Sequence, residues 1–97
     1  MVEHLVFFKV KPEFDEQHFQ TALARFQEIK TAVTGVVDLT FGRNFCDRNK
    51  GFQFGLMVRL ADKDALQRYQ AHPLHQSLVQ ECIKPHLEDI IAIDYEF

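Results

Sequence analysis

The sequence predicts an α+β domain of ferredoxin-like order, β-α-β-β-α-β, with a four-stranded antiparallel sheet that pairs with a second copy as a dimeric α/β barrel. Three observations lead to this fold class. Apolar residues alternate along four segments and recur at helical spacing in two others. The length of 97 residues suits a single domain, residues 1–97, with one core. Ten phenylalanines are many for one such core and indicate a second buried surface.

The first strand is expected over residues 2–10, VEHLVFFKV, and Pro12 ends it. A helix follows, with Asp15 as the expected N-cap and Gly35 as its C-terminal stop. Apolar residues recur at helical spacing between them: Phe19, Ala22, Leu23, Phe26, Ile29 and Val33. This spacing predicts one buried helix face.

A hairpin of two strands is expected next. The strand over residues 36–45 alternates, with Val37, Leu39 and Phe41 on one face. A polar loop over residues 46–51 leads to the strand over residues 52–60, where alternate residues are large and apolar.

The last third of the chain predicts a broken helix and a final strand. Asp62 is the expected N-cap, and His72-Pro73 interrupts the helix because proline disfavours helical geometry in the residue before it. Helix is expected to resume over residues 74–83, and a strand is expected over residues 89–97.

Two crossover helices can cover only one face of this sheet. The more apolar face is expected under the helices and contains Val6, Phe8, Leu39, Phe41, Phe54, Leu56 and Val58. The opposite face displays Leu5, Phe7, Met57, Ile91, Ile93 and Tyr95. An apolar patch of that size is rarely left bare, so we expect it to form a homodimer interface.

Composition argues against several classes of protein. The formal charge of −3 provides no basic field for nucleic acid or anionic lipid, and no segment is apolar enough to span a membrane. The run Lys50-Gly-Phe-Gln-Phe54 resembles an RNA-recognition signature, but outward rings at Phe52 and Phe54 would turn Arg59 into the core. Two distant cysteines fit free thiols in a reducing cytoplasm. We therefore expect a cytoplasmic protein that binds neither nucleic acid nor membrane.

A cluster of polar rings is the main candidate for function. Tyr69, His72 and His75 surround the helix break, while His4 and Asp94 lie on strand positions predicted to face the helices. Polar groups there need partners, so the cluster is either a satisfied structural network or a polar site with a histidine acting as general base. A zinc site at His72, His75 and His4 is disfavoured by the intervening proline, and no metal is expected. His18 and His86 are expected to face solvent.

Five segments, HLVFFKVK, GVVDLTFGRNF, GFQFGLMVRL, ALQRYQAHPLHQ and IDYEF, together resemble the stress-responsive dimeric A/B-barrel (Dabb) family over essentially the whole chain. The resemblance implies a ferredoxin-like homodimer with an apolar cavity between each sheet and its own helices. Its expected lining is Val6, Phe8, Phe26, Leu39, Phe54, Leu56, His72 and Ala92.

A plant polyketide cyclase of this family implies roles for single residues. Tyr69 would anchor a substrate or stabilise an enolate, His75 would be the general base, Asp94 would orient His75, and His4 would line the pocket. The expected function is binding of a small, apolar, oxygenated molecule, with cyclase-like or isomerase-like acid–base chemistry and no cofactor. The alternatives are a non-catalytic stress-associated assembly protein and a cofactor-independent monooxygenase.

Overall fold

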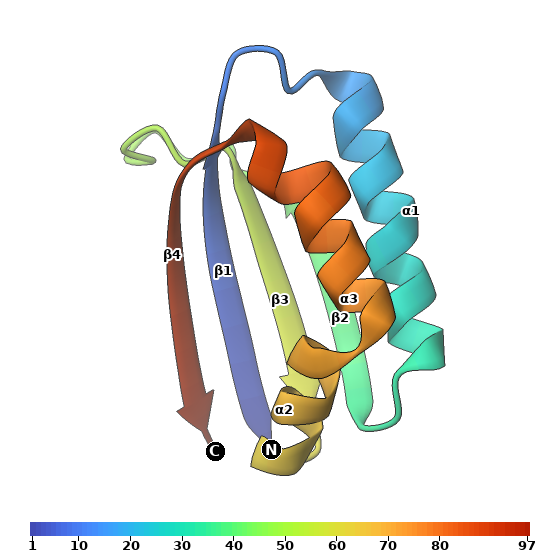
Figure 1. Cartoon of the computed structure of the whole chain (residues 1–97). Coiled ribbons are helices and arrows are strands. Elements are labelled where there is room, and N and C mark those ends of the chain that lie inside the picture. Colours follow the sequence, from blue (N-terminus) through green and yellow to red (C-terminus); the bar gives the residue numbers. More distant parts are fainter.

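The computed structural model describes all 97 residues and has the predicted element order (Figure 1). Its elements are β1 (Val2–Val10), α1 (Glu16–Ala32), β2 (Val36–Arg43), β3 (Phe54–Leu60), α2 (Lys63–Ala71), α3 (Pro73–Leu78), the π-helical segment η1 (Val79–Ile83), the 3-10 turn η2 (Lys84–His86) and β4 (Leu87–Glu96). The sheet is antiparallel throughout in the order β2-β3-β1-β4. This confirms the predicted ferredoxin-like α+β class with its four-stranded antiparallel sheet.

The central hairpin is shorter than expected and its loop is longer. β2 ends at Arg43 and β3 begins at Phe54, whereas the sequence predicted strands reaching Phe45 and starting at Phe52. Side-chain amides of Asn44 and Asn49 bond the loop backbone, which turns through a positive φ at Gly51. These local bonds compete with strand pairing and end the ladder early.

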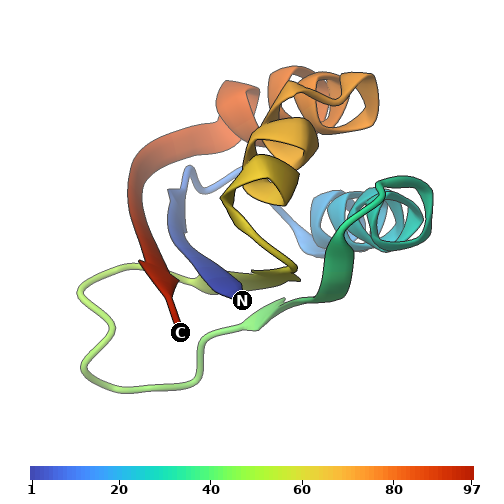
Figure 2. The same cartoon turned by 90° about the horizontal axis from the view of Figure 1, so that it is seen from below.

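The helices lie on one side of the sheet, and the other side is open (Figure 2). The predicted parity holds for β1 and β3, whose helix-facing side chains are buried in a single core. In β2 the register shifts between Val36 and Asp38, so Val37 is an extra residue and is 49% exposed, while Val36 packs on the core. The prediction that Val37 shares the face of Leu39 is therefore wrong, because a β-bulge changes the parity.

The helical layer is narrower than the sheet. β4 lies at the sheet edge, and all of it after Leu87 is exposed. Asp94 is on the helix side of the sheet as predicted, but it lies beyond the helices that were expected to cover it, and its side chain is 43% exposed. Strand β4 also begins at Leu87, two residues before the predicted start at Asp89.

The helix break occurs where the sequence predicted it. The side chain of His72 accepts a hydrogen bond from the backbone N–H of Leu74 at 3.1 Å, so it caps α3, and Pro73 occupies the first helical position. The C-terminus of α1 turns at Gly35, whose φ is 96°, and a Cβ there would lie 2.6 Å from Cβ of Ala65. Only glycine allows α2 to start this close to that turn.

Candidate active site

His4 and Asp94 form the strand part of the site. They are paired residues of β1 and β4, and Nδ1 of His4 is hydrogen-bonded to Oδ1 of Asp94. His4 is 6% exposed, so its ring lies in the protein while the carboxylate reaches solvent. A carboxylate oxygen next to Nδ1 holds the proton on that nitrogen and leaves Nε2 as a hydrogen-bond acceptor.

Tyr69 lies at the centre of the cluster. Its side chain is fully buried, and its hydroxyl has no hydrogen-bond partner in the protein. The ring packs against two imidazoles, with centroids 5.8 Å from His4 and 4.5 Å from His75. Burial raises the pKa of Tyr69 above its usual range, so the hydroxyl stays protonated and remains a donor. An unpaired buried hydroxyl costs about 1–3 kcal/mol, which a bound acceptor would recover.

His75 lies on α3 beside Tyr69 and is half-buried. Its Nδ1 is 3.1 Å from the carbonyl oxygen of Gln70. Because a carbonyl only accepts, Nδ1 carries the proton and Nε2 keeps its lone pair. Burial lowers the pKa of His75, and the hydrogen bond to the Gln70 carbonyl opposes that shift. The ring is therefore neutral near pH 7.

The expected partnership between Asp94 and His75 is replaced by two separate pairs. Asp94 bonds His4 across β1 and β4, and His75 bonds the backbone of Gln70. The reason is placement, since His4 is the direct neighbour of Asp94 in the strand register. No residue pattern could have indicated Gln70, because its role uses a main-chain oxygen.

The predicted apolar lining is part of the packed core. Five of its members are buried (Val6, Phe8, Phe26, Leu39 and Leu56), whereas Phe54 and His72 are partly buried and Ala92 is exposed. Phe8 and Phe26 pack edgewise or tilted against Phe41, in a cluster of aromatic rings. His72 is occupied as the cap of α3.

The three principal cavities lie around this core rather than inside it. One of about 350 Å³ opens beside Asp94, between β4 and α2, and is also lined by Gln67 and Gln70. Neither Tyr69 nor His75 lines any of the three. The cavity beside Asp94 could have been expected from the sequence. A polar stripe on α2 lines it, formed by residues at positions i, i+4 and i+7: Lys63, Gln67 and Gln70.

No group of three or more His, Cys, Asp or Glu side chains is arranged to hold a metal ion. None of the helices has the length and apolar character needed to cross a membrane. The candidate cluster contains one phenol, two imidazoles and one carboxylate.

The fold is a ferredoxin-like α+β sheet with helices on one face, and it brings Tyr69, His4 and His75 together. The chain belongs to the stress responsive A/B barrel domain family, Dabb, whose profile matches residues 2–97. An uncharacterised protein of Streptomyces coelicolor is 30% identical over 100 residues covering 100% of both chains. A stress-response A/B barrel domain-containing protein of Arabidopsis thaliana is 26% identical over 95 residues. That match covers 98% of this chain but only 36% of the Arabidopsis protein, so the chain spans about a third of that relative.

Solved structures share the fold over nearly the full length. A Dabb family protein with a ferredoxin-like fold from Mesorhizobium loti has a TM-score of 0.82 and 27% identity, covering 99% of this chain and 95% of that one. A dimeric ferredoxin-like protein of unknown function from Thermobifida fusca has a TM-score of 0.86 and 19% identity, covering 99% and 90%. Hydroxynitrile lyase from Passiflora edulis has a TM-score of 0.85 and 17% identity, covering 97% and 90%.

Proposed function

We propose that this protein binds a small oxygenated molecule at Tyr69 and carries out acid–base chemistry on it with His75. The observation that carries the proposal is the buried Tyr69 hydroxyl, which has no partner in the chain and belongs to a ring that packs against the imidazoles of His4 and His75. A donor in this position fits a carbonyl or hydroxyl oxygen of a ligand, because any partner must come from outside the chain.

The proposed chemistry is the removal of a proton from a carbon next to a carbonyl group. Nε2 of His75 takes the proton, and the electron pair of the C–H bond becomes the C=C bond of an enolate. The Tyr69 hydroxyl donates to the enolate oxygen, an interaction worth about 2.7–4 kcal/mol when it is preorganised. The proton then returns from His75 to carbon or oxygen of the product, so these proton transfers need only the protein's own side chains.

His4 and Asp94 are proposed to complete the site from the strand side. The carboxylate fixes the His4 tautomer, so Nε2 of His4 is available to accept a hydrogen bond from a ligand hydroxyl. The cavity beside Asp94 and Gln70 supports entry from the β4 edge, where the helices leave the sheet uncovered. Val6, Leu56 and Ala92 are the next residues along the same face and are the proposed apolar contacts.

One solved relative supports this class of ligand. A protein with the same fold is named as a hydroxynitrile lyase, and a hydroxynitrile is a small molecule with a hydroxyl group. A protein of this fold can therefore bind a small oxygenated compound. In this chain the proposed binding site is the cluster that contains Tyr69 and His75.

The test is a thermal-shift screen of small phenolic and β-keto compounds against the wild type and two variants. Tyr69→Phe removes only the unpaired hydroxyl and His75→Gln removes the proposed base. A binder should stabilise the wild type, and its Kd should rise about tenfold in Tyr69→Phe, as expected for the loss of one buried hydrogen bond. The matched control is Thr31→Val, which removes an exposed hydroxyl on α1 that lines none of the three cavities and should leave the Kd unchanged. Equal Kd values in the wild type and Tyr69→Phe would refute the proposal.

We further propose that a second copy of the chain covers the open sheet face. The support is the exposure of Phe7, Ile91, Ile93 and Tyr95, each 38–48%, with Leu5 and Met57 partly buried between them. Because these side chains are already more than half covered in the single chain, covering each of them would contribute somewhat under half of the ~1.5–3 kcal/mol for full burial. Solved relatives from Thermobifida fusca and Jannaschia are described as dimeric.

Two further features of this face favour pairing. Glu3 is 6% exposed and bonds Arg59 at 2.8 Å, so the carboxylate on this face is already paired. Phe45 is fully exposed on the β2–β3 loop, and this loop borders a groove of about 540 Å³ that also includes Phe7 and Ile91. A dimer that buries this face also fits an assembly role without catalysis, which becomes the favoured function if no compound in the screen binds.

A further inference from the structure

Two histidines far apart in the sequence meet at the opposite end of β1 and β4 from the Tyr69 site. His18 lies in the first turn of α1 and His86 in the turn η2 that precedes β4. Their ring centroids are 4.5 Å apart with an interplanar angle of 65°, and the ring of Phe14 packs against both. Both were expected to face solvent, but the His86 side chain is only 19% exposed. Chain topology brings them together, because β1 and β4 are neighbours.

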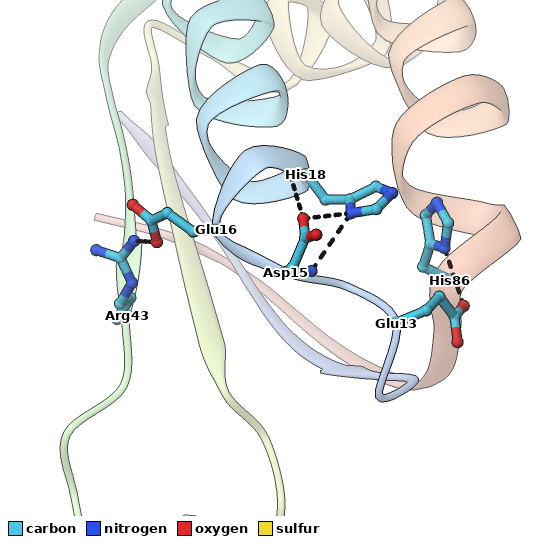
Figure 3. A network of polar contacts seen from close by, with 6 residues as sticks. All are labelled: Glu13, Asp15, Glu16, His18, Arg43 and His86. Atoms are coloured by element: carbon cyan, nitrogen blue, oxygen red, sulfur yellow. Dashed lines mark hydrogen bonds and ion pairs between the residues drawn. The ribbon is translucent and has the colours of Figure 1, made fainter.

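Each imidazole is held by its own carboxylate. Nδ1 of His18 is 2.7 Å from Oδ1 of Asp15, and Nδ1 of His86 is 3.0 Å from Oε2 of Glu13 (Figure 3). Two lone pairs at these distances would repel, so a proton lies on each Nδ1. Since Nδ1 of His18 is the donor, it does not also accept the 3.3 Å contact from the backbone N–H of Asp15.

With the proton on Nδ1, Nε2 of each ring is the nitrogen that can present a lone pair to a ligand. Figure 3 shows this nitrogen of each ring on the side away from its carboxylate.

We propose that Nε2 of His18 and Nε2 of His86 together bind one divalent transition-metal ion. Imidazole suits Zn²⁺, Ni²⁺ and Cu²⁺, and a ligating histidine commonly donates its other ring nitrogen to a carboxylate, which fixes its orientation. An ion about 2.0–2.1 Å from each nitrogen needs the two nitrogens about 3.3 Å apart in tetrahedral geometry. With the ring centroids 4.5 Å apart, the proposal places both Nε2 atoms on one such ion.

The surroundings leave room for the rest of the coordination shell. The two rings line an open cavity of about 350 Å³, together with Gln17, Glu81 and Cys82. Glu81 is 62% exposed at this cavity and pairs with Arg25 at 3.5 Å, and it is not arranged with the two rings as a third ligand, so water fills the remaining positions. With two histidines in place and water at the other positions, the order of affinity is Cu²⁺ above Ni²⁺ and Zn²⁺, with Mg²⁺ far weaker.

The experiment is isothermal titration of the EDTA-treated, dialysed protein near neutral pH with ZnCl₂, NiCl₂ and CuCl₂. MgCl₂ is the ion control. We expect one Ni²⁺ or Cu²⁺ per chain. His18→Gln and His86→Gln should each raise the Kd at least tenfold. Glutamine at position 18 suits this helix position, because it can return a hydrogen bond to the N-cap residue Asp15. Circular dichroism confirms that both variants are folded.

Variants at other positions test whether metal binding is specific to His18 and His86. His72→Ser removes an imidazole elsewhere and keeps a capping side chain, so the Kd for Ni²⁺ should not change. Asp15→Asn and Glu13→Gln keep both ligands and disturb their orientation, so each should weaken binding without abolishing it. The Cu²⁺ complex should give an electron paramagnetic resonance spectrum with coupling to two nitrogens.

Several outcomes would overturn the proposal. They are no binding of Ni²⁺ or Cu²⁺ at millimolar concentration, a Kd that is the same in His18→Gln and the wild type, or loss of binding in His72→Ser. None of these results bears on ligand binding at Tyr69, because the two sites lie at opposite ends of the sheet and share no residue.

Discussion

The carboxylate of Asp94 accepts a hydrogen bond from Nδ1 of His4, its direct partner in the register of β1 and β4. This pair crosses the boundary of the helical layer, since His4 is buried and Asp94 is 43% exposed. A buried imidazole therefore takes its partner from the uncovered edge strand. One residue of the candidate site, Asp94, therefore belongs to β4. The opposite face of the same strand carries Ile91, Ile93 and Tyr95.

Loss of the Asp94 side chain should destabilise the protein through His4. Asp94→Ala leaves the buried Nδ1 donor unpaired, at a cost of about 1–3 kcal/mol in the free energy of unfolding. Asp94→Asn keeps an acceptor and should cost less. Urea unfolding near neutral pH measures both, and Glu88→Ala, on the same strand without a side-chain bond, is the control. An equal loss in Asp94→Ala and Glu88→Ala would show that the pair contributes nothing.

Removal of the Tyr69 hydroxyl should leave stability unchanged or raise it. The hydroxyl is buried without a partner, so Tyr69→Phe removes an unsatisfied group and keeps the ring packing, with an expected gain of up to about 1 kcal/mol. The measurement is urea unfolding of both proteins without added compounds. A loss of about 2 kcal/mol or more would mean that the hydroxyl has a partner in the folded protein.

Tyr69 should also make the protein sensitive to alkali. Its folded pKa is raised by burial, so above about pH 10 the unfolded chain loses the phenol proton and the folded chain keeps it. The contribution of the Tyr69 phenol to the free energy of unfolding is therefore complete below about pH 10, and it falls as the pH rises further. Urea titrations from about pH 9 to about pH 11.5 should show a smaller decline in Tyr69→Phe than in the wild type. Parallel curves would contradict the burial of this phenol.

His75 should make stability fall in mild acid. Burial lowers its folded pKa, so below about pH 6.5 the unfolded chain binds a proton that the folded chain does not. The neutral His75 ring therefore contributes fully to the free energy of unfolding above that pH, and this contribution is lost as the pH falls. The difference in unfolding free energy between about pH 7.5 and about pH 5.5 should shrink in His75→Gln. His72→Ser is the comparison variant, and an equal effect in both would argue against a special environment for His75.

Gly35 should not tolerate a side chain. Gly35→Ala combines a positive φ with a Cβ 2.6 Å from Cβ of Ala65, and should cost roughly 2–4 kcal/mol. Gly42→Ala is the matched control, because nothing lies within 4 Å of its added Cβ. Its unfolding free energy should stay within about 0.5 kcal/mol of the wild type. Similar losses in both variants would refute the close approach of α2 to the Gly35 turn.

The proposed dimer should be sensitive to charge on the open face. Ile93→Asp places a charge at its centre and should yield monomers at micromolar concentration, as measured by light scattering and sedimentation. Val37→Asp changes an equally exposed residue at the β2 bulge and should leave the dimer intact. A wild-type monomer under the same conditions would remove the interface proposal altogether.

Patterns within single elements were readable from sequence. The alternation in β1 and β3, the cap at Asp15 and the break at His72-Pro73 depend on neighbours a few residues away, and the structure confirms all of them. The β2 bulge and the longer loop after Arg43 escaped prediction. Both depend on register and on hydrogen bonds between separate strands or within the loop, which composition and periodicity do not encode.

The sequence by itself determined the fold class, the two faces of the sheet and the gathering of Tyr69 and His75 near one helix break. Only the tertiary structure decided that Asp94 pairs with His4, that β4 lies outside the helical layer, and that His18 meets His86. Each of these depends on distances between side chains from elements far apart in the chain. Such distances follow from sheet order and helix placement, and no local pattern of residues specifies them.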